Sequence, residues 1–473
     1  MRFFVFIILA LVLVYPANGQ NCNCKSNFEW MKKTFEENDA GFQYIIDKKG
    51  QAAYNIHNQL IFEKIKEAKN LTDCSKLLSE WLKFFRSGHV GIQLMAKTAD
   101  NNGENEKGEY ETFNGDISQF KKYIDTKTEA DFEGIWETSP YKIGIKKEGT
   151  NYIGFIIESG VESWKPGMVK LKIKQDNDKL VSTFYMRDHS IDKSEDPKLI
   201  GNNYLQIGQW ELKRLRPVFP PDSLDNYYEI IYAQDPYLKE LNANTLYFRI
   251  PSFDGSEKTA IDSVILANKD KILKTENLII DVRYNGGGND DCYYELLPFL
   301  YTNQIRTIGL EYLSTKQNNQ RMLDFAANAN NEKDKQSFKE KYDKLQSRLG
   351  EFVNVYDEAV SIRRYDTVYE YPKNVGIIVS KECGSTTEQF LLDAKQSKKV
   401  KLFGVNTFGA IDFSNMYYVE SPCKEFRLGY CLTRRLWIPD LAIDNIGLQP
   451  DFYLDESIPP YKWVEFVNKI LNQ

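Results

Sequence analysis

Histidine is scarce in this chain of 473 residues, which contains only three, His57, His89 and His189. The scarcity matters because histidine is the usual general base near neutral pH and the commonest metal ligand. His57 falls within a helical pattern and His189 lies in a charged loop, whereas His89 follows the end of a predicted helix. His89 therefore has the best setting for a catalytic base, although a packed or surface position is the commoner role of a lone histidine.

Metal and cofactor signatures are also lacking. Cys22 and Cys24 have the spacing of half a zinc site, but no matching pair follows at the required distance. A strand at 278–283 runs into a glycine loop at 284–289, yet the loop lacks the lysine of a P-loop and the spacing of a dinucleotide motif. We therefore expect neither a metal nor a cofactor.

The sequence has no large excess of one charge. Its 61 basic and 67 acidic side chains give a net charge of −6. This balance excludes the basic footprint typical of nucleic-acid binding. The length and composition indicate an ordinary globular protein with two or three domains.

Long apolar runs are absent except near the start of the chain. Met1-Arg2, the apolar run 3–15, and the small residues Ala17 and Gly19 predict a secretory signal peptide over 1–19, cleaved before Gln20. An uncleaved anchor is the alternative, although the run is short for a membrane span. We expect a secreted or periplasmic protein without a stable membrane span.

All seven cysteines lie after the predicted cleavage site. An exported protein can form disulfides, and an odd number leaves at least one free thiol or an intermolecular bond. Cys423 and Cys431 flank a predicted hairpin, so the sequence favours a disulfide between them.

The pattern of elements predicts a mixed α/β (α+β) fold in three parts. Residues 20–96 form a predicted N-terminal helical region that carries His89, with helices over 23–86, a strong amphipathic pattern at 73–85 and a strand at 90–95. Short alternating segments predict a small inserted β-rich domain over 97–235. The rest, 236–473, combines buried strands with helices and includes a charged helical excursion at about 318–350.

Ser385 lies where a predicted buried strand, 375–380, gives way to a helix. At such a junction backbone N–H groups point outward, with the positive end of the helix dipole behind them. A serine there is often an N-cap. It can also be a nucleophile whose developing oxyanion those amides stabilise, with Cys383, two residues upstream, as the rival nucleophile.

Four segments, in order along the chain, resemble the carboxyl-terminal processing and tricorn-core family of serine peptidases. They are 87–89 after a helix, the Asp-x-Arg-x-Asn-x-Gly-Gly loop at 281–288, the serine segment 383–388, and 444–451 near the end. The turn 404–409 also matches the family's Gly-x-x-Thr-x-Gly pattern. The resemblance implies a crotonase- or ClpP-like peptidase core.

The resemblance also implies roles for single residues. Ser385 falls on the nucleophile, and Ala410 occupies the place where processing peptidases carry a lysine base. His89 and Asp444 fall on the base and acid of the tricorn-like members, although the family acid is commonly glutamate. Asp440 is the reserve candidate for the acid.

The oxyanion hole implied by the family consists of the Thr386 amide and a glycine amide, from Gly287 or Gly288. The region 97–235 lacks the signature of the PDZ module that many relatives carry, so no groove for substrate carboxyl termini is expected. Taken together, the motifs predict an exported serine peptidase with a Ser-His-Asp triad that acts on peptides or proteins. The alternative is a catalytically silent relative that binds exported peptides or glycans.

Overall fold

The computed structural model describes residues 23–95, 111–176, 179–187, 189, 191–195, 197–208 and 210–473. The predicted signal peptide and Cys22 lie outside the described residues. The chain divides into two compact units. Unit 1 comprises Met1–Asn102, Arg306–Arg363 and Gly409–Gly447, and unit 2 comprises Gly103–Ile305, Arg364–Phe408 and Leu448–Gln473.

Unit 1 begins with four helices, α1 (Cys24–Asn38), α2 (Phe42–Lys49), α3 (Gln51–Ile65) and α4 (Leu71–Leu82). The Asn70 side chain caps α4 by accepting from the Asp73 amide at 2.8 Å, which satisfies one of the free N–H groups of the first turn. Apolar residues at helical spacing, among them Phe35, Leu78 and Trp81, are buried together in one core. The amphipathic pattern of the sequence thus becomes the packing face of a helical layer.

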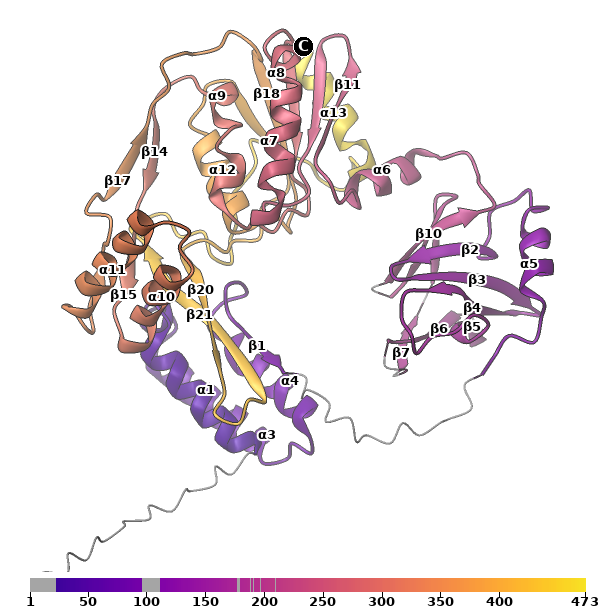
Figure 1. The fold of residues 1–473 in the computed structure, drawn as a ribbon, viewed down its shortest axis with the longest axis horizontal. Helices are drawn as coiled ribbons and strands as arrows, with labels where there is room; N and C mark the ends of the chain where they lie inside the picture. The colour runs from indigo at the N-terminus through magenta and orange to yellow at the C-terminus, as the bar shows by residue number, and fades with distance from the viewer. Residues whose placement is uncertain are drawn as a thin grey trace, which may run out of the picture. The chain divides into compact units, whose positions relative to one another are not determined.

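A five-stranded sheet packs in the same unit (Figure 1). Its path is β1 (Gly91–Leu94), β21 (Phe426–Arg435), β15 (Leu310–Leu313) and β16 (Phe352–Val353), and β20 (Phe413–Glu420) pairs with the other edge of β21 as a hairpin. The charged segment predicted as a helical excursion forms α10 (Lys316–Ala327) and α11 (Glu332–Gln346). Strands β14 (Ile305–Ile308) and β17 (Val360–Arg363) make a separate two-stranded ribbon.

A disulfide joins Cys24 at the start of α1 to Cys74 in α4. The predicted disulfide between Cys423 and Cys431 is wrong. Cys431 is a free, buried thiol whose Sγ donates to the His89 carbonyl at 3.2 Å, whereas Cys423 is disulfide-bonded elsewhere. The position of the two cysteines on either side of a hairpin turn did not predict the disulfide correctly, because Cys431 lies within β21 opposite Met416.

Removal of this cross-link should destabilise the helical layer. The Cys24–Cys74 bond spans 50 residues, and closing a loop of that length lowers the entropy of the unfolded chain enough to stabilise the fold by about 4 kcal/mol. We therefore expect Cys74→Ser to lower the free energy of unfolding by about this amount in urea titrations. Cys24→Ser should lower the free energy of unfolding by the same amount, and the double variant should lower it little further. A double variant as stable as the wild type would contradict the prediction.

The first part of unit 2 is a nine-stranded antiparallel sheet in the order β7-β6-β5-β4-β3-β2-β10-β9-β8. Its strands are β2 (Gly134–Thr138), β3 (Tyr141–Glu148), β4 (Asn151–Ser159), β5 (Val169–Asp176), β6 (Lys179–Tyr185), β7 (Ile191–Glu195), β8 (Lys198–Ile200), β9 (Tyr204–Ile207) and β10 (Trp210–Arg216). Helix α5 (Ile117–Ile124) buries Phe120 and Ile124 against Phe155 and Ile157 of β4. Helix α6 (Ser223–Ile231) follows the sheet.

The second sheet of unit 2 has the order β11-β12-β13-β18-β19-β22. Its strands are β11 (Tyr237–Asn242), β12 (Thr245–Arg249), β13 (Asn277–Asp281), β18 (Asn374–Val379), β19 (Val400–Gly404) and β22 (Phe452–Tyr453). All neighbours from β12 onward are parallel, and only β11 is antiparallel. The carboxyl ends of β13 and β18 therefore lie at one edge, which places the glycine loop beside the serine segment.

Helices cover this parallel sheet, as its apolar strands require. They are α7 (Lys258–Ala267), α8 (Lys269–Ile272), α9 (Leu297–Leu300), α12 (Thr386–Ala394) and α13 (Trp463–Leu471) (Figure 1). Trp463 and Val467 of α13 pack against Ile279 and Ile378 on one face. The predicted mixed α/β fold is confirmed.

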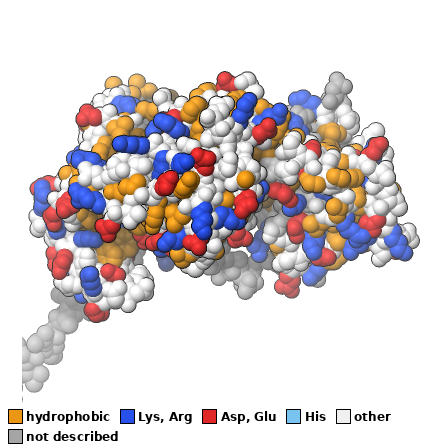
Figure 2. All heavy atoms as spheres, turned by 90° about the horizontal axis from the view of Figure 1, so that it is seen from above, with side chains coloured by type: hydrophobic (Ala, Val, Ile, Leu, Met, Phe, Trp, Pro, Cys, Tyr) orange, Lys and Arg blue, Asp and Glu red, His pale blue; other side chains and the backbone are white. Residues whose placement is uncertain are grey.

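None of the helices in the described part of the chain is long and apolar enough to cross a membrane. On the face shown in Figure 2, basic, acidic and hydrophobic side chains are interspersed.

Candidate active site

Ser385 lies on a sharp turn between β18 and α12, as the sequence predicts. Its φ of 57° is in the left-handed region, which costs a non-glycine residue about 1–3 kcal/mol and persists where surrounding contacts enforce it. One such contact comes from Glu388, whose Oε2 accepts from the Ser385 amide at 3.2 Å. The strained turn presents the serine at the amino end of α12, in the manner of a nucleophile elbow.

Glu388 and Thr407 are site residues that the sequence reading missed. The Glu388 side chain is fully buried, and its other oxygen accepts from the Thr407 hydroxyl. Thr407 Oγ1 in turn accepts from the Leu448 amide at 2.7 Å. The Ser-x-x-Glu spacing, which is that of a capping box, was the available signal. Thr407 is the threonine of the Gly-x-x-Thr-x-Gly turn, so this motif supports the serine turn through Glu388.

The glycine loop touches the serine turn so closely that only glycine fits at 287. A Cβ added to Gly287 would lie 2.8 Å from both the Ser385 Cβ and the Thr386 amide nitrogen, and its φ of +100° also favours glycine. The Thr386 hydroxyl donates to the Gly288 carbonyl at 3.0 Å, which ties the two loops together. The structure thus brings four predicted residues together: Ser385, Thr386, Gly287 and Gly288.

The amides of this cluster differ in their partners. The Gly287 N–H donates to Asn285 Oδ1 at 3.0 Å. Within the described residues the N–H groups of Gly288 and Thr386 have no acceptor. Two unpaired amides beside a serine, one of them in the first turn of a helix, form a pair of donors suited to a developing negative charge. The Gly287 amide, named with Gly288 as the alternative donor, is already occupied.

Asn285 fixes the loop against α12. Its Oδ1 accepts from the Thr387 hydroxyl at 2.8 Å as well as from Gly287, and its Nδ2 donates to the Ile250 carbonyl at 3.3 Å. Because every polar atom of this buried side chain is used, Asn285 acts as a rigid connector between the loop and the serine turn.

The Asp-x-Arg part of the loop is a buried ion pair at the end of β13. Arg283 donates to both carboxylate oxygens of Asp281 and also to the Pro460 carbonyl. Burial alone would raise the pKa of Asp281, but the charges of Arg283 and Arg249 hold it below its ordinary value. The pair therefore stays ionised and anchors the strand end, and it does not reach the serine turn.

Cys383 is not a competing nucleophile. Its side chain is completely buried and its Sγ donates to the Val282 carbonyl at 3.1 Å. Burial raises the pKa of the thiol to about 12, so the reactive thiolate is not populated at neutral pH.

His89, which belongs to unit 1, is half-buried on the turn between α4 and β1, with a φ of 54°. Its Nδ1 donates to the Phe413 carbonyl at 2.7 Å. Because a carbonyl only accepts, the neutral ring carries its proton on Nδ1, and Nε2 is the ring nitrogen that can take up a proton. Burial lowers the pKa of His89, and the charges of Arg86 and Arg435 lower it further, so the ring is neutral at pH 7.

Buried groups also fix the backbone beneath His89. Arg86 forms a buried ion pair with Asp39 and donates to the His89 carbonyl at 3.2 Å. The same carbonyl accepts from the Cys431 thiol. The imidazole of His89 therefore has a defined orientation, because its Nδ1 and the backbone carbonyl of the same residue are both hydrogen-bonded.

Asp444, also in unit 1, makes its hydrogen bonds to backbone. Its Oδ1 accepts from the Ile411 amide at 2.7 Å and from the Asp412 amide at 2.8 Å, and no hydrogen bond joins it to His89. Asp412 reciprocates by accepting from the amides of Ile443 and Asp444, both at 2.8 Å. Burial and the charge of Asp412 raise the pKa of Asp444 to about 7. The two carboxylates therefore hold the segments 411–412 and 443–444 together. Asp412 directly precedes Phe413 in the chain.

The remaining candidates lie in other surroundings. His57 shares a hydrogen bond with the Trp81 carbonyl and stacks on Phe84. His189 stacks on Trp164, with ring centroids 4.2 Å apart. Asp440 is exposed in a turn. Across the described ranges no group of three or more potential ligands could hold a metal ion.

A serine on a strained strand-to-helix turn, backed by a glycine loop at the carboxyl edge of a parallel sheet, defines the class of serine-type hydrolases. Residues 244–454 match the model of Peptidase family S41, and this stretch includes the glycine loop and the serine turn. This stretch of the chain is similar to that family, and the protein is a serine-type peptidase.

Solved structures match most of this chain at low sequence identity. A structure of mature CPAF complexed with lactacystin has a TM-score of 0.51 and 12% identity, and the match covers 95% of this chain and 98% of that one. The tricorn protease (TM-score 0.42, 13% identity, 95% of this chain and 36% of that one) also matches. The photosystem II D1 C-terminal processing protease matches as well (TM-score 0.38, 11% identity, 94% and 96%). No curated protein matches the sequence.

Proposed function

We propose that this protein is an exported peptidase in which Ser385 is the nucleophile, His89 the general base, and the amides of Thr386 and Gly288 the oxyanion donors. The observation that carries the proposal is the serine turn itself. Ser385 is held in a strained conformation next to two backbone amides that have no acceptor in the described part of the chain. Strain of this kind is expensive and collects at functional sites.

The chemistry follows from these groups. His89 Nε2 takes the proton from Ser385 Oγ as Oγ attacks the scissile carbonyl carbon, and the carbonyl oxygen becomes an oxyanion stabilised by the two amides. The imidazolium then gives its proton to the leaving amine, and the C–N bond breaks. Water, deprotonated by the same imidazole, hydrolyses the acyl-enzyme and releases the second product.

Asp444 enters this proposal as a positioning residue. Its hydrogen bonds hold the segment that leads to the Phe413 carbonyl, and that carbonyl fixes the tautomer of His89. The family resemblance suggests a different role, in which the carboxylate orients the imidazole directly. That role stays a prediction, and mutagenesis distinguishes it from the positioning role.

Asp444→Asn should lower kcat/KM by less than tenfold, because an asparagine oxygen can accept from the same two amides. Asp444→Ala should lower it by about 10- to 100-fold, since both amides lose their acceptor and the Phe413 carbonyl is no longer fixed. Steady-state hydrolysis of a peptide checks both variants. A fall of about 10³-fold or more in Asp444→Asn would instead show that the carboxylate orients the imidazole directly.

Export is part of the proposal and rests on two observations. The sequence begins with a signal-peptide pattern, and Cys24 is joined to Cys74. Disulfides persist in oxidising compartments and are rare in the cytosol.

The proposal is tested by labelling with a fluorophosphonate, which reacts only with an activated serine. We expect stoichiometric labelling of the wild-type chain at Ser385, located by mass spectrometry of the labelled peptide. A folded protein that stays unlabelled would contradict catalysis and favour the silent, peptide-binding alternative.

A further inference from the structure

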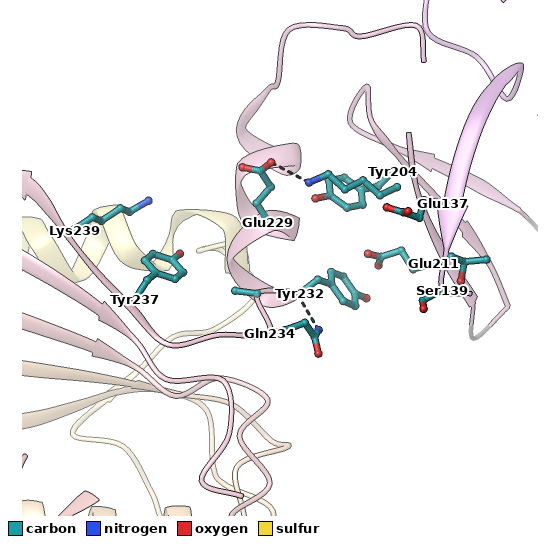
Figure 3. A pocket seen from close by; sticks show the side chains of 12 residues that line it. Glu137, Ser139, Tyr204, Glu211, Glu229, Tyr232, Gln234, Tyr237 and Lys239 are labelled. Carbon is teal, nitrogen blue, oxygen red and sulfur yellow. Dashed lines mark hydrogen bonds and ion pairs between the residues drawn. The ribbon is translucent and has the colours of Figure 1, made fainter. Parts of the chain in front are cut away.

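A cavity of about 820 Å³ opens beside α6 in unit 2 (Figure 3). Strands β2, β9 and β10 form one wall, α6 and the turn after it form a second, and β11 contributes the far side. The side chains that matter here are Glu137, Tyr204, Glu211, Lys213, Glu229 and Tyr232. None of them belongs to the catalytic cluster.

The walls of this cavity are fixed to one another through α6. Asp225, which is buried, accepts from the amides of Asn202 and Asn203 at 3.2 and 2.8 Å on the side of the antiparallel sheet. On the other side the Arg249 guanidinium donates to the Ile230 carbonyl at 2.9 Å. Buried charged groups anchor the helix at both ends, so the cavity is a built feature.

Strand register places two carboxylates on the same wall. Lys213 of β10 lies opposite Glu137 of β2 and opposite Tyr204 of β9. Glu211 precedes Lys213 by two residues and therefore points to the same face of the sheet. Diagonal neighbours of this kind are about 7–8 Å apart, a separation that leaves room for a cation between their carboxylates.

The positive charges of the cavity do not neutralise these two acids. Lys213 Nζ lies 3.4 Å from the Glu229 carboxylate. Lys239 extends from β11, on the far side of the cavity from Glu137 and Glu211 in Figure 3. In the described part of the chain neither Glu137 nor Glu211 has an ion-pair partner. Burial raises the pKa of Glu211 to about 7, as expected of a carboxylate that lacks a counter-charge.

Aromatic rings complete this end of the cavity. Tyr204 and Tyr228 have ring centroids 5.2 Å apart, and Tyr228 stacks on Tyr232 at 5.6 Å. Tyr232 also donates its hydroxyl to Glu211. Tyrosine faces attract ammonium and guanidinium groups, most strongly where water is partly excluded.

We propose that this cavity binds the lysine or arginine side chain of a peptide substrate, with the cationic group between Glu137 and Glu211 and against the rings of Tyr204 and Tyr232. The inference rests on the proposed peptidase function, because it takes the ligand to be part of a substrate. The β-rich sheet would then select substrates at a place separate from the serine turn.

The test measures binding without catalysis. The full chain carrying Ser385→Ala is titrated against fluorescein-labelled Gly-Gly-Lys-Gly-Gly-amide and against the same peptide with norleucine in place of lysine, and fluorescence anisotropy is followed. We expect the lysine peptide to bind at least tenfold more tightly. Glu137→Gln and Glu211→Gln should each weaken it about tenfold, whereas Glu162→Gln, the same charge change on an exposed residue of the β-rich part outside the cavity, should have no effect.

Equal affinity for the two peptides would overturn the inference, as would equal effects of the three glutamine variants. Failure here is distinguishable from failure of the proposed function, because fluorophosphonate labelling of the wild type reports on Ser385 alone. Labelling without lysine preference contradicts only the cavity assignment. Lysine preference without labelling supports the cavity and contradicts the proposed catalysis.

Discussion

Ser385→Ala should abolish peptide hydrolysis, with a loss in kcat of at least about 10⁴-fold, because it removes the hydroxyl that attacks the scissile carbonyl. The Cys383 thiol two residues away is buried and stays protonated at neutral pH. Fluorophosphonate labelling should disappear together with hydrolysis. The free energy of unfolding should fall by only about 1 kcal/mol, because the variant loses the side-chain half of the capping box but keeps the bond from the residue 385 backbone N–H to Glu388.

The matched control is Ser263→Ala, which removes an exposed hydroxyl from α7 of the same unit and should leave hydrolysis and labelling unchanged. The thermal midpoint of each variant shows that the chain is folded. Hydrolysis that persists in folded Ser385→Ala would remove Ser385 as the nucleophile.

His89→Ala should reduce kcat/KM by a comparable factor, about 10⁴-fold, because Ser385 would lose the base that takes its proton. The pH profile gives an independent readout. The base must be neutral to act, so activity should be lost as the pH falls through the pKa of His89. Since burial lowers that pKa, the midpoint of the acid limb should lie below the ordinary value of 6.5.

His57→Ala and His189→Ala are the controls, and both should keep the activity and the acid limb. A wild-type profile that rises only above about pH 9 would indicate a lysine base and would contradict the assignment. Ala410, which stands where related peptidases carry that lysine, makes such a profile unexpected.

The sequence was most informative where a pattern is enforced locally. The apolar run 375–380 followed by helical spacing predicted β18, the turn at Ser385 and α12, because burial and periodicity alone determine these elements. The glycine loop was recognisable for a similar reason, since Gly287 has no room for a side chain. The mixed α/β class followed from the alternation of such segments.

What the sequence could not provide depends on tertiary contacts. The hydrogen bond from His89 to the Phe413 carbonyl joins residues 324 positions apart, and a backbone acceptor leaves no trace in residue types. The Cys24–Cys74 disulfide likewise depends on how α1 packs on α4. Glu388 was visible as part of a capping box, but its bond to Thr407 requires β18 and β19 to be neighbours.

The two units alternate along the chain, and the backbone passes between them five times, after residues 102, 305, 363, 408 and 447. A contiguous fragment that contains one unit complete therefore also contains segments of the other unit. One of the passages falls between Thr407, whose hydroxyl supports the serine turn through Glu388, and Gly409, whose carbonyl accepts from the Asn445 amide beside Asp444. A single nick in this short turn would cut the covalent link between the segment that supports the serine turn and the segment that leads to Phe413.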